Sequence, residues 1–200
     1  MYYPLMVDLK NKNICIVGAG EVSLRKAKKF LEYEANVTVI SIEFKEEFYD
    51  LKGQYHDKIK LIKDEYKEEY LHNTLLVEVA TDNHFINEEI ARLCNKKNIL
   101  CNVVDNKTKS DVIIPSTVKR GDLIISISTL GNSPSFCSRV RKELEKKYDS
   151  STEEFIRLLG EGRELVLHKI HDKSEKKRVL NSMAYMEIEE LKQFIIRMKG

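Results

Sequence analysis

The chain has 200 residues, 33% charged and 42% hydrophobic, which excludes a disordered protein and supplies enough apolar material for a core. Its 34 basic and 32 acidic residues leave a formal net charge of +2, which disfavours general nucleic-acid binding. No apolar run is long enough for a membrane span, and the first residues lack a secretory signal pattern. We therefore expect a cytoplasmic protein that binds neither nucleic acid nor membranes.

Alternating apolar runs and helical spacings fill the first half of the chain. Short β-branched runs, typical of strands buried on both faces, occur at residues 14–17, 37–40, 59–62, 75–80 and 99–104. Helical spacing of apolar side chains separates them at residues 22–33 and 83–97. This alternation predicts an α/β fold, a doubly wound parallel sheet with helices on both faces.

The pattern changes after residue 105. We expect two short strands, at residues 112–114 and at residues 123–128, where LIISIS alternates apolar and polar side chains. From residue 135 the spacing is helical to the end, with a break expected at Gly160 and Gly162. We predict a nucleotide-binding domain over residues 1–112, a small β/α region over residues 113–148, and a helical tail over residues 149–200.

The glycine loop that follows the first strand predicts a dinucleotide site. Gly18 permits a tight turn, and Gly20 lets the backbone approach a pyrophosphate at the start of the next helix. Ser23 stands where this Rossmann-like motif has Gly or Ala. Glu43, two residues beyond the second strand, favours NAD over NADP by binding the ribose hydroxyls, although a solvated loop acid explains it equally well. Lys45 is the nearest basic residue.

Polar residues follow two further strands of the predicted sheet. Ala80 and Thr81 close the strand at residues 75–80, so they are expected to line the cofactor pocket. Asp82 and Asn83 are alternative N-caps for the helix that follows. Asp105 ends the next strand and is a candidate general base, although its position alone favours a turn aspartate.

Several segments, taken in order over residues 2–145, resemble the precorrin-2 dehydrogenase family, the dehydrogenase and chelatase part of siroheme synthase. They are YPLMVDLKNKNICIVGAGEVSLRKAKKFLE, VEVATDN, NVVDNKTKSDVIIPSTVKRGDLIISIST, and GNSP with a basic helix behind it. The resemblance implies NAD-dependent oxidation of precorrin-2 to sirohydrochlorin. It also implies a homodimer formed through the middle β region, with the tetrapyrrole between the nucleotide domain and the partner.

The resemblance assigns roles to further residues. The catalytic aspartate of the family falls on Asp105, with Asn102 in the same site. The nucleotide loop includes Glu21 and Val22 besides the two glycines, and Ile42 with Glu43 falls on the segment at the adenosine end. Some members of the family also insert Fe²⁺ into sirohydrochlorin, and the sequence does not decide between dehydrogenation alone and both activities.

The eight carboxylates of the tetrapyrrole call for cations and hydrogen-bond donors in its site. Pro134 suits the first turn of a helix capped by Asn132 or Ser133, while Leu130 stands where the family has a glycine. The candidate substrate-binding residues are Asn102, Arg120, Ser128, Thr129, Ser133 and Arg139.

Alternative interpretations fit the sequence less well. A short-chain dehydrogenase is excluded because no tyrosine is followed four residues later by lysine. A non-catalytic NAD-sensing domain would share the glycine loop but would not need NVVD, the STLGNSP segment or the basic helix. His168 and His171 at helical spacing suggest a metal entry point, although an exposed polar face explains them better. The four cysteines have no CxxC spacing, so no metal ligands are assigned.

Overall fold

The computed structural model describes residues 1–104 and 106–200. The chain divides into two compact units, Met1–Ile114 and Pro115–Gly200. The first unit holds the strands β1 (Asn13–Val17), β2 (Asn36–Ser41), β3 (Ile59–Lys63), β4 (Leu76–Val79) and β5 (Leu100–Val103). Its α-helices are α1 (Glu21–Glu32), α2 (Glu46–Tyr55) and α3 (His84–Lys97), and the short 3₁₀ segments are η1 (His56–Lys58), η2 (Glu68–Leu71) and η3 (Lys107–Lys109).

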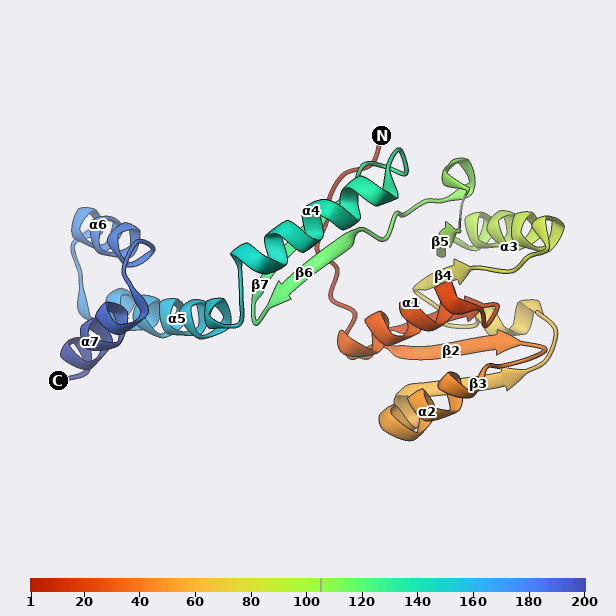
Figure 1. Cartoon of the computed structure of the whole chain (residues 1–200), viewed down its shortest axis with the longest axis horizontal. Helices are drawn as coiled ribbons and strands as arrows, with labels where there is room; N and C mark the ends of the chain where they lie inside the picture. The colour runs from red at the N-terminus through yellow and green to blue at the C-terminus, as the bar shows by residue number, and fades with distance from the viewer. Residues whose placement is uncertain (105) are drawn as a thin grey trace. The chain divides into compact units, whose positions relative to one another are not determined.

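The five strands form one parallel sheet in the order β3-β2-β1-β4-β5 (Figure 1). Apolar side chains on one face, including Ile14 and Val37, pack with residues of α1 and α2. Those on the opposite face, including Cys15 and Val77, pack with α3. Burial of both faces explains the continuous apolar runs in the sequence and confirms the predicted doubly wound α/β fold.

The connection between β3 and β4 differs from that of a regular doubly wound sheet. Between β3 and β4 the chain forms only η2, whereas α-helices follow β1, β2 and β4. The helix α2 has two buried residues, Phe48 and Leu51, so its apolar face is narrow. A face this narrow explains why the sequence shows no clear helical spacing in that segment.

The second unit begins with an antiparallel pair, β6 (Ser116–Arg120) and β7 (Leu123–Ile127). The helices α4 (Pro134–Lys147), α5 (Ser151–Lys169), α6 (Lys173–Met183) and α7 (Ile188–Lys199) follow (Figure 1). Leu158, Val166 and Met183 form a small core with Leu191 and Ile195. The helical character expected from residue 135 is confirmed.

Two expectations for secondary structure were wrong. Residues 112–114 form no strand, and the strand starts at Ser116 instead. Val112 and Ile114 are apolar because they pack against the core around α1 and α2, while the backbone of residues 111–112 donates to Cys101 O. The helix α5 also runs unbroken through Gly160 and Gly162. Gly162 is buried because Met183 and Ile195 pack over it.

Candidate nucleotide pocket and substrate residues

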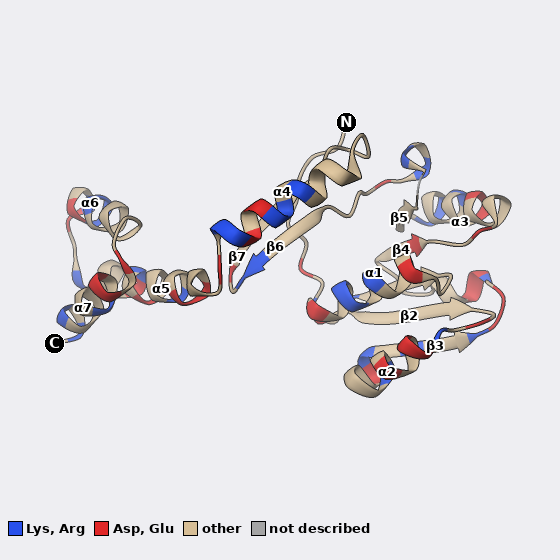
Figure 2. Cartoon of the chain, viewed as in Figure 1, with Lys and Arg blue, Asp and Glu red and all other residues tan. Residues whose placement is uncertain are grey.

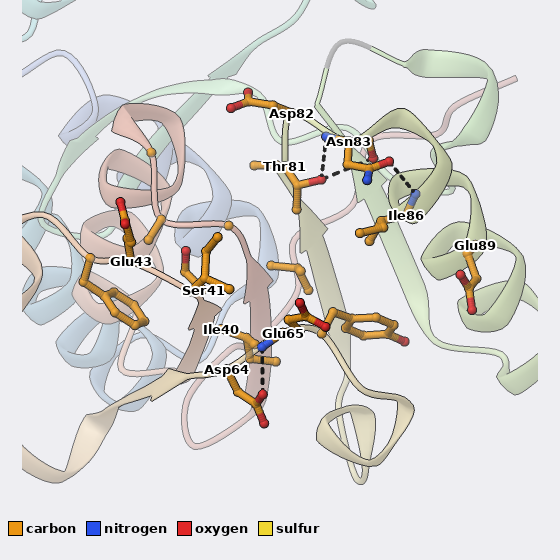
Figure 3. A pocket seen from close by; sticks show the side chains of 18 of the residues that line it. Ile40, Ser41, Glu43, Asp64, Glu65, Thr81, Asp82, Asn83, Ile86 and Glu89 are labelled. Atoms are coloured by element: carbon orange, nitrogen blue, oxygen red, sulfur yellow. Dashed lines mark hydrogen bonds between the residues drawn. The ribbon is translucent and has the colours of Figure 1, made fainter.

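A cavity of about 1350 Å³ opens at the carboxyl ends of the central strands (Figure 3). The end of β1 contributes Val17 and Gly18, β2 contributes Ile40 and Ser41, and Ala80 follows β4. Parallel strands that end at one edge of a sheet leave a crevice there where ligands bind in doubly wound folds. Six of the predicted cofactor residues line this cavity: Gly18, Gly20, Ile42, Glu43, Ala80 and Thr81.

Glycine suits the two positions in the loop for different physical reasons. Gly18 has φ +102°, and a Cβ atom there would lie 2.3 Å from Ala80 O, so the loop closes against the chain after β4 only with glycine. Gly20 is the N-cap of α1, and a Cβ there would meet nothing within 4 Å. The space beside Gly20 therefore stays open at a helix N-terminus, where free N–H groups attract a phosphate.

The first turn of α1 carries the other loop residues. Ser23 is fully buried, as the close approach of helix and sheet at this position requires, and its hydroxyl finds no hydrogen-bond partner among the described residues. Glu21 does not line the cavity, but it forms an ion pair with Lys45, which does. This pairing raises the pKa of Lys45 and lowers that of Glu21, chiefly through their mutual hydrogen bond. Val22 is half-buried and lies outside the lining.

The loop after β4 is held by side-chain hydrogen bonds. Asn83, rather than Asp82, caps α3, because its Oδ1 accepts from the backbone N–H groups of Phe85 and Ile86 at 3.0 and 3.2 Å. Asn87, one turn further along, donates to Thr81 O at 2.9 Å and accepts from the Thr81 hydroxyl. These bonds fix Thr81 at the cavity wall. Figure 3 shows Thr81 beside Asn83 and the bond between Asn83 and Ile86.

The cavity also extends to residues that the sequence did not indicate. On one side it is lined by Asp64, Glu65, Tyr66 and Glu68, and on the other by α3, through Glu89, Arg92 and Lys96. The short η2 in place of a helix between β3 and β4 brings this loop, not a helix, to the cavity wall. No sequence motif marks these positions, so their place in the pocket follows only from the fold.

A buried polar cluster lies inside the sheet next to the pocket strands. Glu78, in the middle of β4, is fully buried and forms an ion pair with Lys26 of α1. Its two carboxylate oxygens accept from Asn102 Nδ2 at 2.8 and 2.9 Å. Burial raises the pKa of the Glu78 carboxyl above its ordinary value of 4.5, and the Lys26 ammonium opposes that rise without cancelling it. The only signal in the sequence was a glutamate inside an otherwise apolar strand.

The predicted substrate residues of the second unit lie around the β7–α4 loop and at the far end of α4. Ser133 is the N-cap of α4, with Pro134 in the first turn, as expected. Thr129 Oγ1 accepts from Ser133 N–H at 2.9 Å, and Ser128 Oγ accepts from Leu130 N–H at 3.0 Å. Leu130, where the family has glycine, takes φ +52°, in the region that glycine favours.

Several basic residues of the second unit are spaced along α4 (Figure 2). Arg120 donates to the carbonyls of Tyr148, Lys119 and Glu145, which ties it to the C-terminal end of α4. Arg139 forms an ion pair with Glu143 at 3.6 Å and lies over the ring of Phe136. The role of each arginine toward the substrate stays a prediction.

Asp105, the predicted catalytic residue, lies outside the described residues. His168 and His171 do not share a helix face, because α5 ends at Lys169 and its C-cap is Ile170, and both side chains are exposed. Within residues 1–104 and 106–200, no group of three His, Cys, Asp or Glu side chains could hold a metal ion, and no helix is long and apolar enough to cross a membrane.

Comparisons with known proteins agree with this geometry. Residues 5–116 match the model of a family described as putative NAD(P)-binding. The precorrin-2 dehydrogenase of Methanosarcina barkeri is 35% identical over 188 residues, which cover 90% of this chain and 81% of the relative. The chain belongs to the precorrin-2 dehydrogenase family.

Longer and structural relatives fit the same assignment. The siroheme synthase of Pseudoalteromonas translucida is 36% identical over 144 residues, 72% of this chain and 30% of that protein. The chain thus spans about a third of the length of the siroheme synthases that it matches. A solved structure of SirC, a precorrin-2 dehydrogenase, superposes with a TM-score of 0.80 at 26% identity and covers 99% of both chains. The predicted family and fold class are confirmed.

Proposed function

We propose that this chain catalyses the NAD-dependent oxidation of precorrin-2 to sirohydrochlorin. The observation that carries the proposal is a nucleotide pocket built on Gly18, Gly20 and Ala80 in a chain that matches a precorrin-2 dehydrogenase over 81% of its length. A non-catalytic NAD-sensing domain is the alternative, and it explains the pocket but not a match that continues through the second unit.

The residues of the pocket fit a dinucleotide. The open space at Gly20 and the N-terminus of α1 suit the pyrophosphate, and Ile42 with Glu43 suits the adenosine end. The Glu43 carboxylate would accept hydrogen bonds from the ribose hydroxyls and repel a 2′-phosphate. Lys45, the nearest cation, is already paired with Glu21. The pocket therefore favours NAD over NADP.

The oxidation removes a hydride and a proton from the tetrapyrrole. NAD, when bound, supplies the hydride acceptor. Asp105 accepts the proton as general base, directly or through water. Ser128, Thr129, Ser133, Arg120 and Arg139 are assigned to the carboxylate arms of the substrate, whose negative charge demands donors and cations.

A homodimer completes the proposal. The strands β6 and β7 form a two-stranded sheet, in which the apolar residues Leu123, Ile124 and Ile125 of β7 are each half-buried. A two-stranded sheet is marginal by itself, so a second copy that extends or covers it would stabilise it.

The Asp105→Ala variant tests the catalytic role. We expect NAD affinity to stay within about twofold of wild type in a calorimetric titration, while turnover of precorrin-2 falls by about 10²-fold or more because the proton acceptor is lost. The exposed Asp57→Ala substitution is the control and should leave both values unchanged. Near-normal turnover of Asp105→Ala would remove the assignment of the base.

Metal insertion into sirohydrochlorin remains a separate proposal. The same protein, supplied with sirohydrochlorin and Fe²⁺ or Co²⁺, should insert the metal faster than the uncatalysed reaction if the chain also has this activity. A rate equal to the uncatalysed one would restrict it to dehydrogenation.

A further inference from the structure

The ends of three neighbouring strands line the nucleotide cavity side by side. Gly18 follows β1, Glu43 follows β2 and Glu65 follows β3, and these strands stand in the order β3-β2-β1. Neighbouring strands are about 4.8 Å apart, so each one faces a different part of a bound dinucleotide. With the pyrophosphate at the glycine loop and the ribose at Glu43, the adenine base comes to the loop after β3.

This part of the cavity combines apolar walls with one open hydrogen-bond acceptor. Ile40, Tyr66 and Ile86 line it and offer apolar surface to the faces of a planar ring. Glu65 is exposed, and in the part of the chain that the structure describes its carboxylate receives no hydrogen bond and forms no ion pair. Figure 3 shows this carboxylate directed into the pocket, on the side of Ile86.

The neighbouring Asp64 holds the backbone of the same loop. Its Oδ1 accepts from the Glu65 N–H at 2.8 Å, and its Oδ2 accepts from the Lys67 ammonium and the Tyr70 hydroxyl. These hydrogen bonds, chiefly the one from Lys67, lower the pKa of Asp64, so the carboxylate stays charged and paired at neutral pH. Asp64 therefore fixes the loop, and Glu65 is the acceptor left for a ligand.

We infer that Glu65 recognises the adenine base of the cofactor by accepting a hydrogen bond from its 6-amino group. This inference rests on the proposed function. An ionised carboxylate has no hydrogen to donate, so it binds the 6-amino group of adenine and repels the 6-oxo group of hypoxanthine or guanine. Glu65 is thus a specificity-determining residue for the base, in the same pocket where Glu43 faces the ribose.

Nicotinamide hypoxanthine dinucleotide tests the assignment, because it has a 6-oxo group where NAD has the 6-amino group and is otherwise the same dinucleotide. Calorimetric titration of the full chain should give an affinity for NAD about tenfold higher than for this analogue, the effect of one hydrogen bond to a charged group. In Glu65→Gln the ratio of the two affinities should fall to near one. The introduced amide can accept from a 6-amino group or donate to a 6-oxo group, so it no longer discriminates.

Glu69→Gln is the matched control, because it removes the same charge from the same β3–β4 connection. Glu69 is exposed and does not line the cavity, so this variant should keep the wild-type ratio of affinities. Equal affinities in the wild-type protein, or a wild-type ratio retained by Glu65→Gln, would overturn the inference. Binding of NAD without conversion of precorrin-2 would instead refute the proposed function, so the two failures are distinguishable.

Discussion

Glu78 places a carboxylate in the apolar interior of β4, where a charge is tolerated only with partners. The sequence draws attention to Glu78, because it is the one charged residue in the apolar segment LLVEVA. Its partners are not evident there: Asn102 is 24 residues away and Lys26 lies on a helix, and only the β4–β5 register and the packing of α1 bring them together. Gly18 could be predicted, and the caps Asn83 and Ser133 could each be narrowed to two adjacent residues, because turns and caps are local features.

The raised pKa of Glu78 gives a pH-dependent prediction. A carboxyl whose pKa is higher in the folded than in the unfolded protein contributes stability that is present below the unfolded value, near 4.5, and is lost as the pH rises through the folded value. The glutamine of Glu78→Gln does not titrate. The Tm of this variant minus that of wild type should therefore become more positive from about pH 4 to about pH 8.

The measurement is thermal unfolding followed by circular dichroism across this range. Val77→Ala is the comparison, and its Tm difference from wild type should not change with pH. A Glu78→Gln difference that is constant, or that becomes more negative as pH rises, would contradict a buried carboxylate with a raised pKa.

At the scale of elements, periodicity predicted what is buried on a regular face. The five parallel strands and the helices α1 and α3 have such faces. Periodicity failed where a residue packed against the core does not belong to a regular element, and where a regular element buries few residues. Val112 and Ile114 are partly buried but lie in a loop, and α2 is a helix that buries too few side chains to show helical spacing. The glycines of α5 indicated a break because sequence alone does not show that Met183 covers Gly162.

The two glycines of α5 form a matched pair for a prediction. Gly160 is exposed, and a Cβ there meets nothing within 4 Å, so Gly160→Ala should raise the free energy of unfolding by about 1 kcal/mol through helix propensity. A Cβ at Gly162 would lie 2.4 Å from Met183 Cε, so Gly162→Ala must displace that side chain. The atom displaced is the end of a flexible methionine, so the overpacking costs about 1 kcal/mol, the low end of the usual range, and cancels the same propensity gain.

Urea unfolding of the full chain, followed by circular dichroism, measures the difference between the two variants. Gly160→Ala should be the more stable by about 1 kcal/mol, the overpacking cost that only Gly162→Ala incurs. Equal stabilities would show that α6 and α7 do not pack on α5 at Gly162 as described.

At the scale of the whole molecule, the alternation of strands and helices predicted the nucleotide-binding unit, because each buried apolar run forms one strand of a doubly wound sheet. Six of the eight predicted cofactor residues line the pocket because they follow strand ends. The pocket wall at Tyr66 instead depends on a β3–β4 connection without an α-helix, and the wall along α3 depends on how that helix packs beside β4. The substrate residues rest on resemblance to a family, because recognition of a tetrapyrrole leaves no local pattern in the chain.

The central claim is tested most directly by supplying the purified full chain with precorrin-2 and either NAD or NADP, and following sirohydrochlorin and reduced cofactor by absorbance. We predict one reduced cofactor for each sirohydrochlorin formed, with a higher kcat/KM for NAD than for NADP. Binding of NAD without conversion of precorrin-2 by either cofactor would contradict the account and favour a nucleotide-sensing domain.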